Sequence, residues 1–473
     1  MTGAARPLTG RIASAASNVV LAAFALVCAV GLWRVIAVIG LRVPLDPNEG
    51  WNAYLAAAAL AGHPLYPDAQ AYLVNNYPPL SFYLVGALGK LVGDAIVAGR
   101  VLSLFAFFAL IAGVFQAVRA MKGCTGGALL AGFLLAAWLI VGSDYVGMDD
   151  PQLLGHALQI AALLLVLKRS PNDIAGAALF ALALFVKHNL VAMPVAAGVW
   201  LLMEDRRRAW RFIGSGAVFL FVGLALFRIV YGTSLLAHLM SARSYSFALL
   251  ADNLGQWLIW GAVPILIAAA LGLVRWRDAH VRLAVLYAGA AILIAIAFAG
   301  GAGVDANVFF DADIALALGA GLAFNRAGSD RRQALLSAAL LLPLAFGLYQ
   351  ASRDEDWRDW DYWRHPMADE AAAARRDIAF LRARPGRALC EMLSYCYWAG
   401  KPAEVDMFNV GQQFATGARR DDALVRAIEA HAFATMEFDT LDPFALGPQV
   451  RAAVLANYRI DHADDDGVFL VPR

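Results

Sequence analysis

Apolar stretches of about twenty residues recur along the first three quarters of the chain, and short segments with charged residues separate them. Stretches of this length are typical of helices that cross a bilayer. The pattern predicts about eleven spans, which begin near residues 19, 95, 125, 150, 173, 190, 210, 255, 281, 306 and 333. The segment from Ile174 to Met203 is so short that its two spans would form a tight hairpin, which need not cross the membrane completely.

Two long segments do not follow this pattern. Residues 42–94 form a first loop rich in Pro and Tyr, in which the apolar run from Leu80 to Val92 predicts a helix at the membrane interface. Residues 351–473 contain 21 of the chain's 37 Asp and Glu residues. We therefore expect a transmembrane domain over residues 1–350 and a small soluble domain over residues 351–473.

Strand and helix patterns alternate in the C-terminal segment, as in a compact α/β domain. Strands are predicted at Arg387–Trp398, Glu404–Phe408, Ala434–Phe438 and Gly467–Val471, and helices at Asp421–His431 and Gln449–Asn457. Cys390 and Cys396 lie in the first of these strands and its turn, and two interpretations are open. They form a disulfide in an oxidising compartment, or they are two buried thiols.

Composition agrees with a multispan membrane protein. The chain is 61% hydrophobic and 16% charged, with a mean hydropathy of +0.61. Soluble domains are about 45–50% apolar and about 25% charged. The net charge of +1 and the lack of a basic run argue against a nucleic-acid partner. The first apolar stretch, residues 18–41, is too long for a signal peptide and no clear cleavage site follows it, so we expect an uncleaved anchor.

Basic residues predict the orientation, because loops on the cytoplasmic side are enriched in Lys and Arg. The main basic clusters are Arg119/Lys122, Arg206–Arg208, Arg275/Arg277/Arg282 and Arg326/Arg331/Arg332. The intervening loops carry mostly Asp and Glu. Placing every basic cluster inside puts the N-terminus in the cytoplasm, and an odd number of spans puts the C-terminal domain outside.

Four polar segments interrupt or border the apolar stretches, where polar residues are costly and indicate function. All four lie on the outer side in this topology. They are Asp46-Pro47-Asn48-Glu49-Gly50, Gly147-Met148-Asp149-Asp150-Pro151, Lys187-His188-Asn189, and the segment from Asp305 to Asp313 that contains Asn307 and Asp311. Asp46 and Glu49 stand out, because two carboxylates held where a span ends are a usual place for a general base.

Structural explanations compete at each of these positions. Asp149, Asp150, Asp311 and Asp313 can serve as helix N-caps or lie in solvated loops. Lys187 and His188 can extend to the membrane interface, although two adjacent polar groups are more than one anchor requires.

Over residues 46–103, the order Asp-Pro-Asn-Glu-Gly, Gly-His-Pro-Leu-Tyr, Asn-Tyr-Pro-Pro-Leu and Ala-Gly-Arg-Val-Leu-Ser resembles the first outer loop of GT-C glycosyltransferases. These multispan enzymes include the protein O-mannosyltransferases and the lipid A aminoarabinose transferases. The segment 147–152 is similar to the family's second acidic turn, with Met148 in place of the usual Arg. Phe185–Leu190 looks like the family's Lys-containing stretch, and Asn307–Asp311 resembles its Asn-Tyr-x-x-Glu segment.

The resemblance implies a GT-C-like fold and inverting transfer of a sugar from a polyprenyl-phosphate donor to a lipid, glycan or protein acceptor on the outer face. In such a reaction Asp46 would be the general base, and Glu49 would orient it or bind the acceptor. Lys187, His188 and Arg100 would hold the donor phosphate. Asp149, Asp150, Asn307 and Asp311 would bind sugar hydroxyls or a divalent metal, if one is used. Tyr77 would pack against the sugar or lipid, or would belong to an interfacial aromatic belt.

Two other classes of function share some of these features. A transporter or flippase of lipid-linked sugars also has many spans and intramembrane polar residues, but the sequence shows no internal repeat and no pair of broken helices. A scaffold whose outer domain binds a partner leaves the Lys187-His188 pair and the Asp46 loop unexplained. The composition and the family likeness suggest a bacterial inner membrane. The sugar, the carrier length, the acceptor and the metal requirement stay open.

Overall fold

The computed structural model describes residues 8–473 except for 69–70, 169–170, 354–359 and 465–466. A helix is present at each of the eleven predicted spans. Seven of the described helices are long and apolar enough to cross a membrane. They are α1 (Leu8–Val38), α4 (Ala95–Ala120), α9 (Arg206–Tyr231), α11 (Phe247–Arg275), α12 (Ala279–Phe298), α13 (Phe310–Arg326) with its leading turn η1 (Ala306–Phe309), and α14 (Asp330–Ala351).

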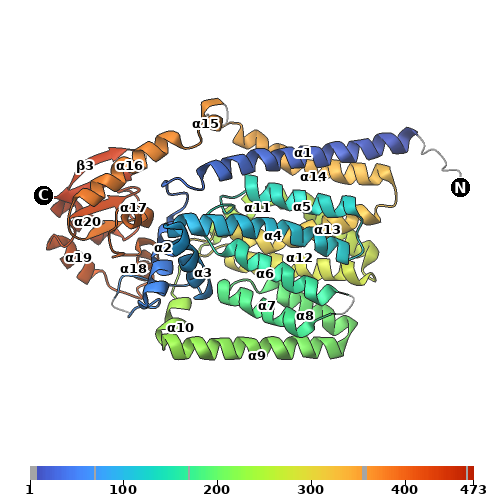
Figure 1. Cartoon of the computed structure of the whole chain (residues 1–473), viewed down its shortest axis with the longest axis horizontal. Coiled ribbons are helices and arrows are strands. Elements are labelled where there is room, and N and C mark those ends of the chain that lie inside the picture. The colour runs from blue at the N-terminus through green and yellow to red at the C-terminus, as the bar shows by residue number, and fades with distance from the viewer. Residues whose placement is uncertain (1–7, 69–70, 169–170, 354–359, 465–466) are drawn as a thin grey trace.

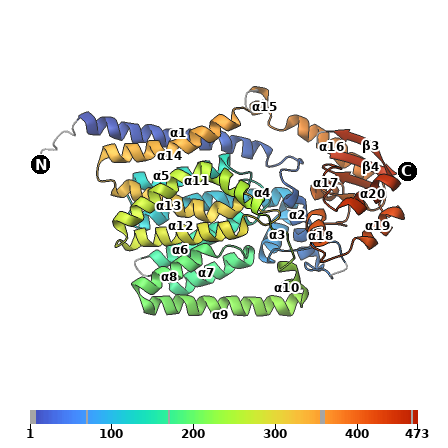
Figure 2. The same ribbon diagram turned by 180° about the vertical axis from the view of Figure 1, so that it is seen from behind.

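Four shorter apolar helices complete the bundle: α5 (Thr125–Val141), α6 (Gln152–Leu167), α7 (Asp173–Val186) and α8 (Ala192–Glu204). The last two form the predicted short hairpin. α1 and α14 lie along one edge of the bundle and α9 lies along the opposite edge (Figures 1 and 2). α13 is buried along almost its whole length, whereas α9 exposes many apolar side chains, as expected for a helix that faces lipid.

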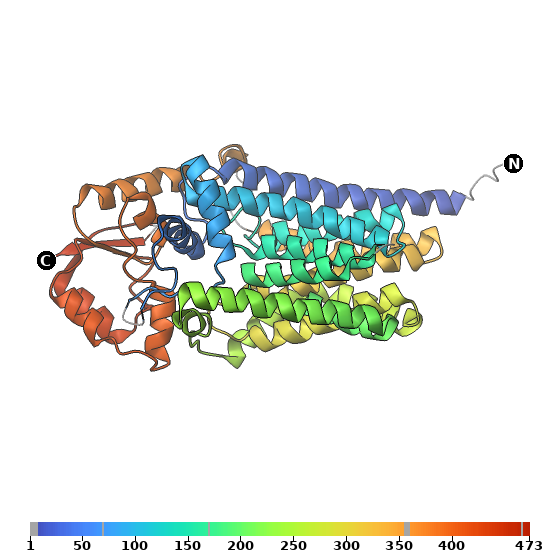
Figure 3. The ribbon, with the colours of Figure 1, turned by 60° about the horizontal axis from the view of Figure 1, so that its bottom comes forward.

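The C-terminal domain sits at one end of the bundle, which we call the domain end (Figure 3). Three helices of the loops gather there: α2 (Pro47–Ala61), α3 (Leu80–Val92) and α10 (Ser234–Leu239). The bounds of α3 are those predicted from the sequence. Several hydrogen bonds link the domain to this layer. For example, Trp398 Nε1 donates to Asp94 Oδ2 at 3.0 Å, and the Tyr54 hydroxyl donates to the Lys401 carbonyl at 2.6 Å.

The C-terminal domain contains a four-stranded sheet in the order β1-β2-β4-β3. Its strands are β1 (Ala388–Cys390), β2 (Thr435–Phe438), β3 (Tyr458–Asp464) and β4 (Gly467–Pro472), and only β1 and β2 are parallel. The helices of this part of the chain are α15 (Trp360–Arg364), α16 (Ala368–Ala383), α17 (Leu393–Trp398), α18 (Met407–Ala415), α19 (Asp422–Glu429) and α20 (Pro448–Asn457). The predicted α/β character of the domain is confirmed.

Two of the predicted strands are wrong in detail. The strand predicted from Arg387 ends at Cys390, and the chain then turns into α17. Glu404–Phe408 does not form a strand, because the Asp406 side chain accepts a hydrogen bond from Asn409 N at 3.0 Å and starts α18. The sequence also gave no signal for β3, which is an edge strand with mostly exposed residues and therefore lacks an alternating apolar pattern.

Cys390 and Cys396 form a disulfide with a Cα–Cα distance of 6.1 Å. The structure thus selects the first of the two interpretations. The bond is feasible because Cys396 lies on α17 and not on the same strand as Cys390.

Candidate active site

The four polar segments identified in the sequence converge at the domain end of the bundle. Lys187 Nζ contacts both carboxylate oxygens of Asp150 at 2.9 and 3.1 Å. Asn52 of α2 donates to the Asp149 carbonyl at 2.6 Å. Gln152 of α6 donates to the Asn307 carbonyl at 3.4 Å. Hydrogen bonds between residues as far as 155 positions apart therefore join these segments into one polar region.

The centre of this region is an ion pair between Glu49 of α2 and Arg100 of α4. Arg100 Nε donates to Glu49 Oε1 at 2.7 Å, and Nη2 donates to Oε2 at 2.6 Å. Both side chains have an exposed fraction of 0%. A two-point pair of this kind has a defined geometry, which a lysine in place of the arginine would not reproduce.

The same pair organises the loop that leads from α1 to Asp46. Arg100 also donates to the carbonyls of Leu41 and Val43, at 2.7 and 2.6 Å. The Glu49 carboxylate accepts from Leu45 N at 2.9 Å and from Asp149 N at 3.1 Å. Both side chains are fully engaged and inaccessible in this structure, in which Arg100 and Glu49 hold the site together. This fits the expectation that Glu49 orients Asp46, and the expected binding roles of the two residues stay predictions.

Asp46 lies immediately beyond this pair, at the N-cap of α2. Its Oδ1 accepts from Asn48 N at 2.7 Å, and Pro47 occupies the first helical position. The side chain is half-buried. Burial raises the pKa of Asp46 to about 6, with smaller contributions from the charges of Asp150 and Glu49, while the hydrogen bonds from Asn48 oppose the rise.

Asp149 and Asp150 are buried on the turn before α6. Asp150 accepts from Gln152 N at 2.7 Å and from the Tyr77 hydroxyl at 3.3 Å, so it acts both as a helix cap and as the partner of Lys187. Asp149 fits against α4 only because residue 99 is glycine: a Cβ at Gly99 would lie 1.8 Å from Asp149 Oδ1. Burial, with the charges of Glu49 and Asp150, raises the pKa of Asp149 well above its usual range and favours its neutral form.

A cavity of about 300 Å³ opens beside Lys187. We call it the cationic pocket, because its lining includes the side chains Lys187, His188 and Arg243, together with Tyr77 and Asn307. The Lys187 ammonium stands 4.6 Å from the centre of the Tyr77 ring. The pocket therefore combines positive charge, aromatic surface and amide groups at the domain end.

Arg243 was not among the residues predicted from the sequence. It donates to the Ala302 carbonyl at 3.3 Å and to Asn409 Oδ1 of α18 at 3.2 Å, so the C-terminal domain helps to hold it at the pocket. A signal for it existed, because Arg243 is an isolated basic residue in a loop on the side predicted to be poor in Lys and Arg.

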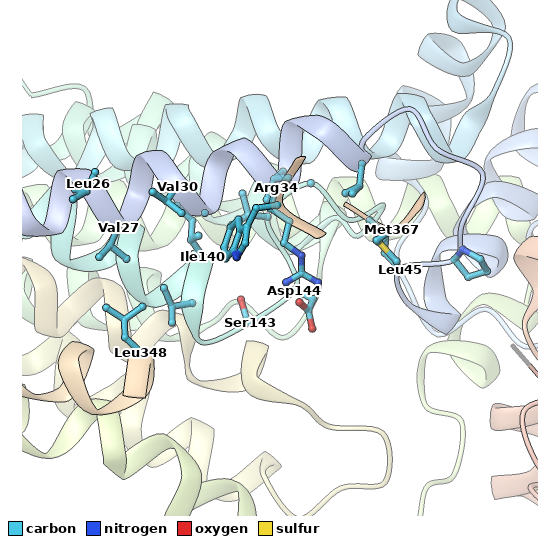
Figure 4. Close-up of a pocket in the computed structure, with 18 residues that line it drawn as sticks. Leu26, Val27, Val30, Arg34, Leu45, Ile140, Ser143, Asp144, Leu348 and Met367 are labelled. Atoms are coloured by element: carbon cyan, nitrogen blue, oxygen red, sulfur yellow. The ribbon is translucent and has the colours of Figure 1, made fainter. Parts of the chain in front are cut away.

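A larger cavity, of about 560 Å³, lies between α1, α5 and α14 (Figure 4). We call it the apolar pocket. Leu26, Val27, Val30, Ile140 and Leu348 are among its lining residues, and Figure 4 shows Arg34 pointing toward Asp144 at its polar end. Pro44 and Leu45 also line it, and the next residue in the chain is Asp46.

Asp311 does not line either of these two cavities. It accepts a hydrogen bond from the Tyr287 hydroxyl at 2.5 Å, in the contact between α12 and α13. Its neighbour Asp313 accepts from Trp257 Nε1 at 2.8 Å. In this structure Asp311 thus contributes to helix packing, and its expected role in sugar binding stays a prediction.

The carboxylates at the domain end are not arranged as a metal site. In the part of the chain that the structure describes, the one group of three or more such ligands close enough to share an ion lies in the C-terminal domain. Asp149 and Asp150 instead bond to the protein itself. The expected use of these residues as metal ligands thus has no geometric support.

Comparisons with known proteins agree with this architecture. Residues 76–232, about a third of the chain, match the family model described as dolichyl-phosphate-mannose-protein mannosyltransferase. The fold is similar to ArnT from Cupriavidus metallidurans bound to undecaprenyl phosphate, with a TM-score of 0.62, 15% identity, and 94% of this chain and 97% of that chain covered. The apo state of the same protein gives a TM-score of 0.62 at 14% identity, with 96% and 97% covered. No curated protein sequence matches the chain.

The central ion pair leads to a stability prediction. Replacing Glu49 with Gln keeps the shape of the side chain but leaves the Arg100 charge buried without compensation. Breaking a buried pair in this way costs about 3–5 kcal/mol. The control is Glu404→Gln, which breaks the more exposed pair with Arg387 and costs about 1 kcal/mol or less. Unfolding of the purified proteins in detergent measures both, and equal small losses would contradict the role given to Glu49.

Proposed function

We propose that this chain, which its sequence match and its fold place in the GT-C glycosyltransferase superfamily, transfers a sugar from a polyprenyl-phosphate donor to an acceptor, with inversion and with Asp46 as the general base. The observation that carries the proposal is the charge balance of the site. Glu49 and Asp150 are neutralised by buried cations, and the neutral form of Asp149 is favoured. Asp46 is the remaining carboxylate of the group, and it is only half-buried.

The chemistry requires such a group. An acceptor hydroxyl attacks the anomeric carbon, forms the new glycosidic bond and gives its proton to a base, while the bond from that carbon to the phosphate oxygen breaks and the phosphate leaves with its lipid. A base with a pKa near the working pH is ionised often enough to act and still holds the proton it receives. The raised pKa of Asp46, about 6, meets this condition at neutral pH.

The leaving phosphate needs positive charge close to the membrane. Lys187 and Arg243 of the cationic pocket are the side chains available for it, and His188 can donate a hydrogen bond. Tyr77 and Asn307 lie beside them for the sugar. The similarly folded ArnT was solved with undecaprenyl phosphate bound, which supports a polyprenyl-phosphate donor for this chain. The Lys187–Asp150 contact would then be shared with the phosphate when the donor binds.

The apolar pocket supports an acceptor with a lipid part. It opens beside the loop that carries Asp46, on the α1 and α14 edge of the bundle, which lies opposite the edge formed by α9. A lipid chain in this pocket would bring a polar head toward the loop that carries Asp46.

The orientation is proposed from the distribution of charge. Ion pairs of basic residues gather at the end of the bundle opposite the C-terminal domain: Arg208–Asp173, Arg282–Glu204 and Arg326–Asp278. Placing this end in the cytoplasm follows the bias of basic residues. Transfer would then take place on the outer face of a bacterial inner membrane, beneath the C-terminal domain. A transporter fits the structure less well, because the polar groups gather at one end and not at the membrane midplane.

Asp46→Asn tests the base directly. Asn caps a helix as well as Asp does, so α2 should remain folded while the base is lost. We expect sugar transfer, or slow hydrolysis of the donor, to fall by about 10²–10⁴-fold. In the wild type the rate should rise with pH through about 6, because Asp46 acts only when ionised.

The matched control is Asp205→Asn, which changes the N-cap of α9 at the opposite end of the bundle. It should leave the rate unchanged. Full activity of Asp46→Asn, or movement of intact donor across vesicles with no transfer in the wild type, would overturn the assignment.

Arg243→Gln tests the donor site. Hydrogen bonds to charged groups contribute about 1.5–3 kcal/mol, so we expect the affinity for undecaprenyl phosphate to fall by about ten- to a hundredfold. The variant Arg420→Gln, which removes an exposed arginine paired with Asp422, serves as the control. Unchanged binding by Arg243→Gln would exclude this pocket as the phosphate site.

Val30→Trp tests the apolar pocket, because the larger side chain would fill space between α1 and α5. Transfer to a lipid acceptor should show a raised KM for the acceptor and an unchanged KM for the donor. The measurement uses lipid extracts fractionated by chain length, with Leu91→Trp on the exposed side of α3 as the control. A raised KM for the donor instead would place the donor lipid in this pocket.

A further inference from the structure

We propose that Asp377, His462 and Asp464 of the C-terminal domain bind a divalent transition metal, zinc or a similar ion, which joins α16 to the edge strand β3. One ligand atom from each side chain lies within 4.8 Å of the others. α16 and β3 lie side by side in the domain (Figure 1). The proposal does not depend on the sugar-transfer function, because these residues belong to neither pocket at the domain end.

The spacing of Asp377 and His462 suits a tetrahedral ion. His462 Nε2 lies 3.3 Å from Asp377 Oδ1. Two ligands bound at about 2.0–2.1 Å with tetrahedral angles are about 3.3 Å apart. The side chains are therefore already at the separation that an ion between them would impose.

A second, independent observation is that one carboxylate oxygen of Asp377 is buried without a hydrogen-bond partner in the described structure. Its side chain is 1% exposed, and its Oδ2 atom has no hydrogen-bond partner in the part of the chain that the structure describes. Buried carboxylate oxygens are normally bonded, since leaving one unsatisfied is unfavourable. A cation in front of Asp377 would satisfy this oxygen without a change of fold.

The surroundings of His462 also match those of a metal ligand. Its Nδ1 lies 3.2 Å from Asp461 Oδ2, and a carboxylate in that position keeps the proton on Nδ1 and leaves Nε2 able to bind a metal. The imidazole stacks on Phe469 with ring centres 4.6 Å apart, which fixes its orientation. Arg384 stands 3.6 Å from Asp461 and holds this outer carboxylate in turn.

The donor set selects the class of ion. One imidazole nitrogen and two carboxylates suit zinc or manganese better than calcium or magnesium, which prefer oxygen ligands alone. Three protein ligands leave a fourth position for water. Because the ion would bind only the folded domain, it would raise the stability of the domain. It would also hold the exposed edge strand β3 against α16.

The test uses the full chain in detergent after treatment with EDTA. Zinc is titrated while uptake is followed by elemental analysis and calorimetry, and domain unfolding is followed by heat. We expect one zinc per chain and a raised unfolding temperature. Asp377→Asn, His462→Gln and Asp464→Asn should each weaken binding by at least a hundredfold, and Asp461→Asn by about ten- to a hundredfold.

Two features keep the test decisive. His431→Gln removes an exposed histidine of the same domain that bonds to the Asn457 carbonyl, so it should leave zinc binding unchanged. Asp464 is exposed, so Asp464→Asn should fold normally even if the buried variants do not. Lack of zinc uptake by the EDTA-treated wild type would show that Asp377 and His462 form only an ion pair. Equal zinc binding by wild type and Asp464→Asn would overturn the three-residue site, because Asp464 would then not be a ligand.

Discussion

The buried pair of Glu49 and Arg100 is the interaction on which the site depends. It connects α2 to α4, holds the carbonyls of the loop that follows α1, and accepts the backbone N–H of Asp149. Removing two charges from water is expensive, and such a pair is stable only when its remaining hydrogen-bonding groups are satisfied. Here the Leu41 and Val43 carbonyls and two backbone N–H groups satisfy them. The pair therefore fixes the position of Asp46, which follows this loop at the start of α2.

The two ion pairs of the site also explain how one carboxylate among four can act as a base. Glu49 and Asp150 each have a cation within hydrogen-bonding distance, and burial favours the neutral form of Asp149. Asp46 has no such cation in the described structure, so burial and the neighbouring carboxylates raise its pKa toward neutrality. In the proposed reaction, the same polar region would supply a proton acceptor beside a pocket of positive charge, which is the combination that displacement of a lipid phosphate requires.

Much of the fold could be predicted because a bilayer imposes a long apolar repeat that is visible in the sequence. The four polar segments could also be predicted, since Asp46 or Lys187 in apolar surroundings is rare. The pairing could not be predicted, because nothing in the sequence indicates that Glu49 bonds to an arginine 51 residues later. Arg100 was therefore expected to hold the donor phosphate, and Glu49 to orient Asp46 or to bind the acceptor. Edge strand β3 and Arg243 of the cationic pocket were missed for a related reason, because their places come from neighbours that are distant in the sequence.

A structure of the chain with a phosphonate analogue of a polyprenyl-phosphate sugar, which cannot be cleaved, would test the central claim most directly. The account predicts that the phosphonate lies within hydrogen-bonding distance of Lys187 or Arg243 in the cationic pocket. It also predicts that the anomeric carbon faces the Asp46 carboxylate with room for an acceptor hydroxyl between them. An analogue bound in the apolar pocket with its phosphonate at Arg34, or a sugar directed away from Asp46, would contradict it.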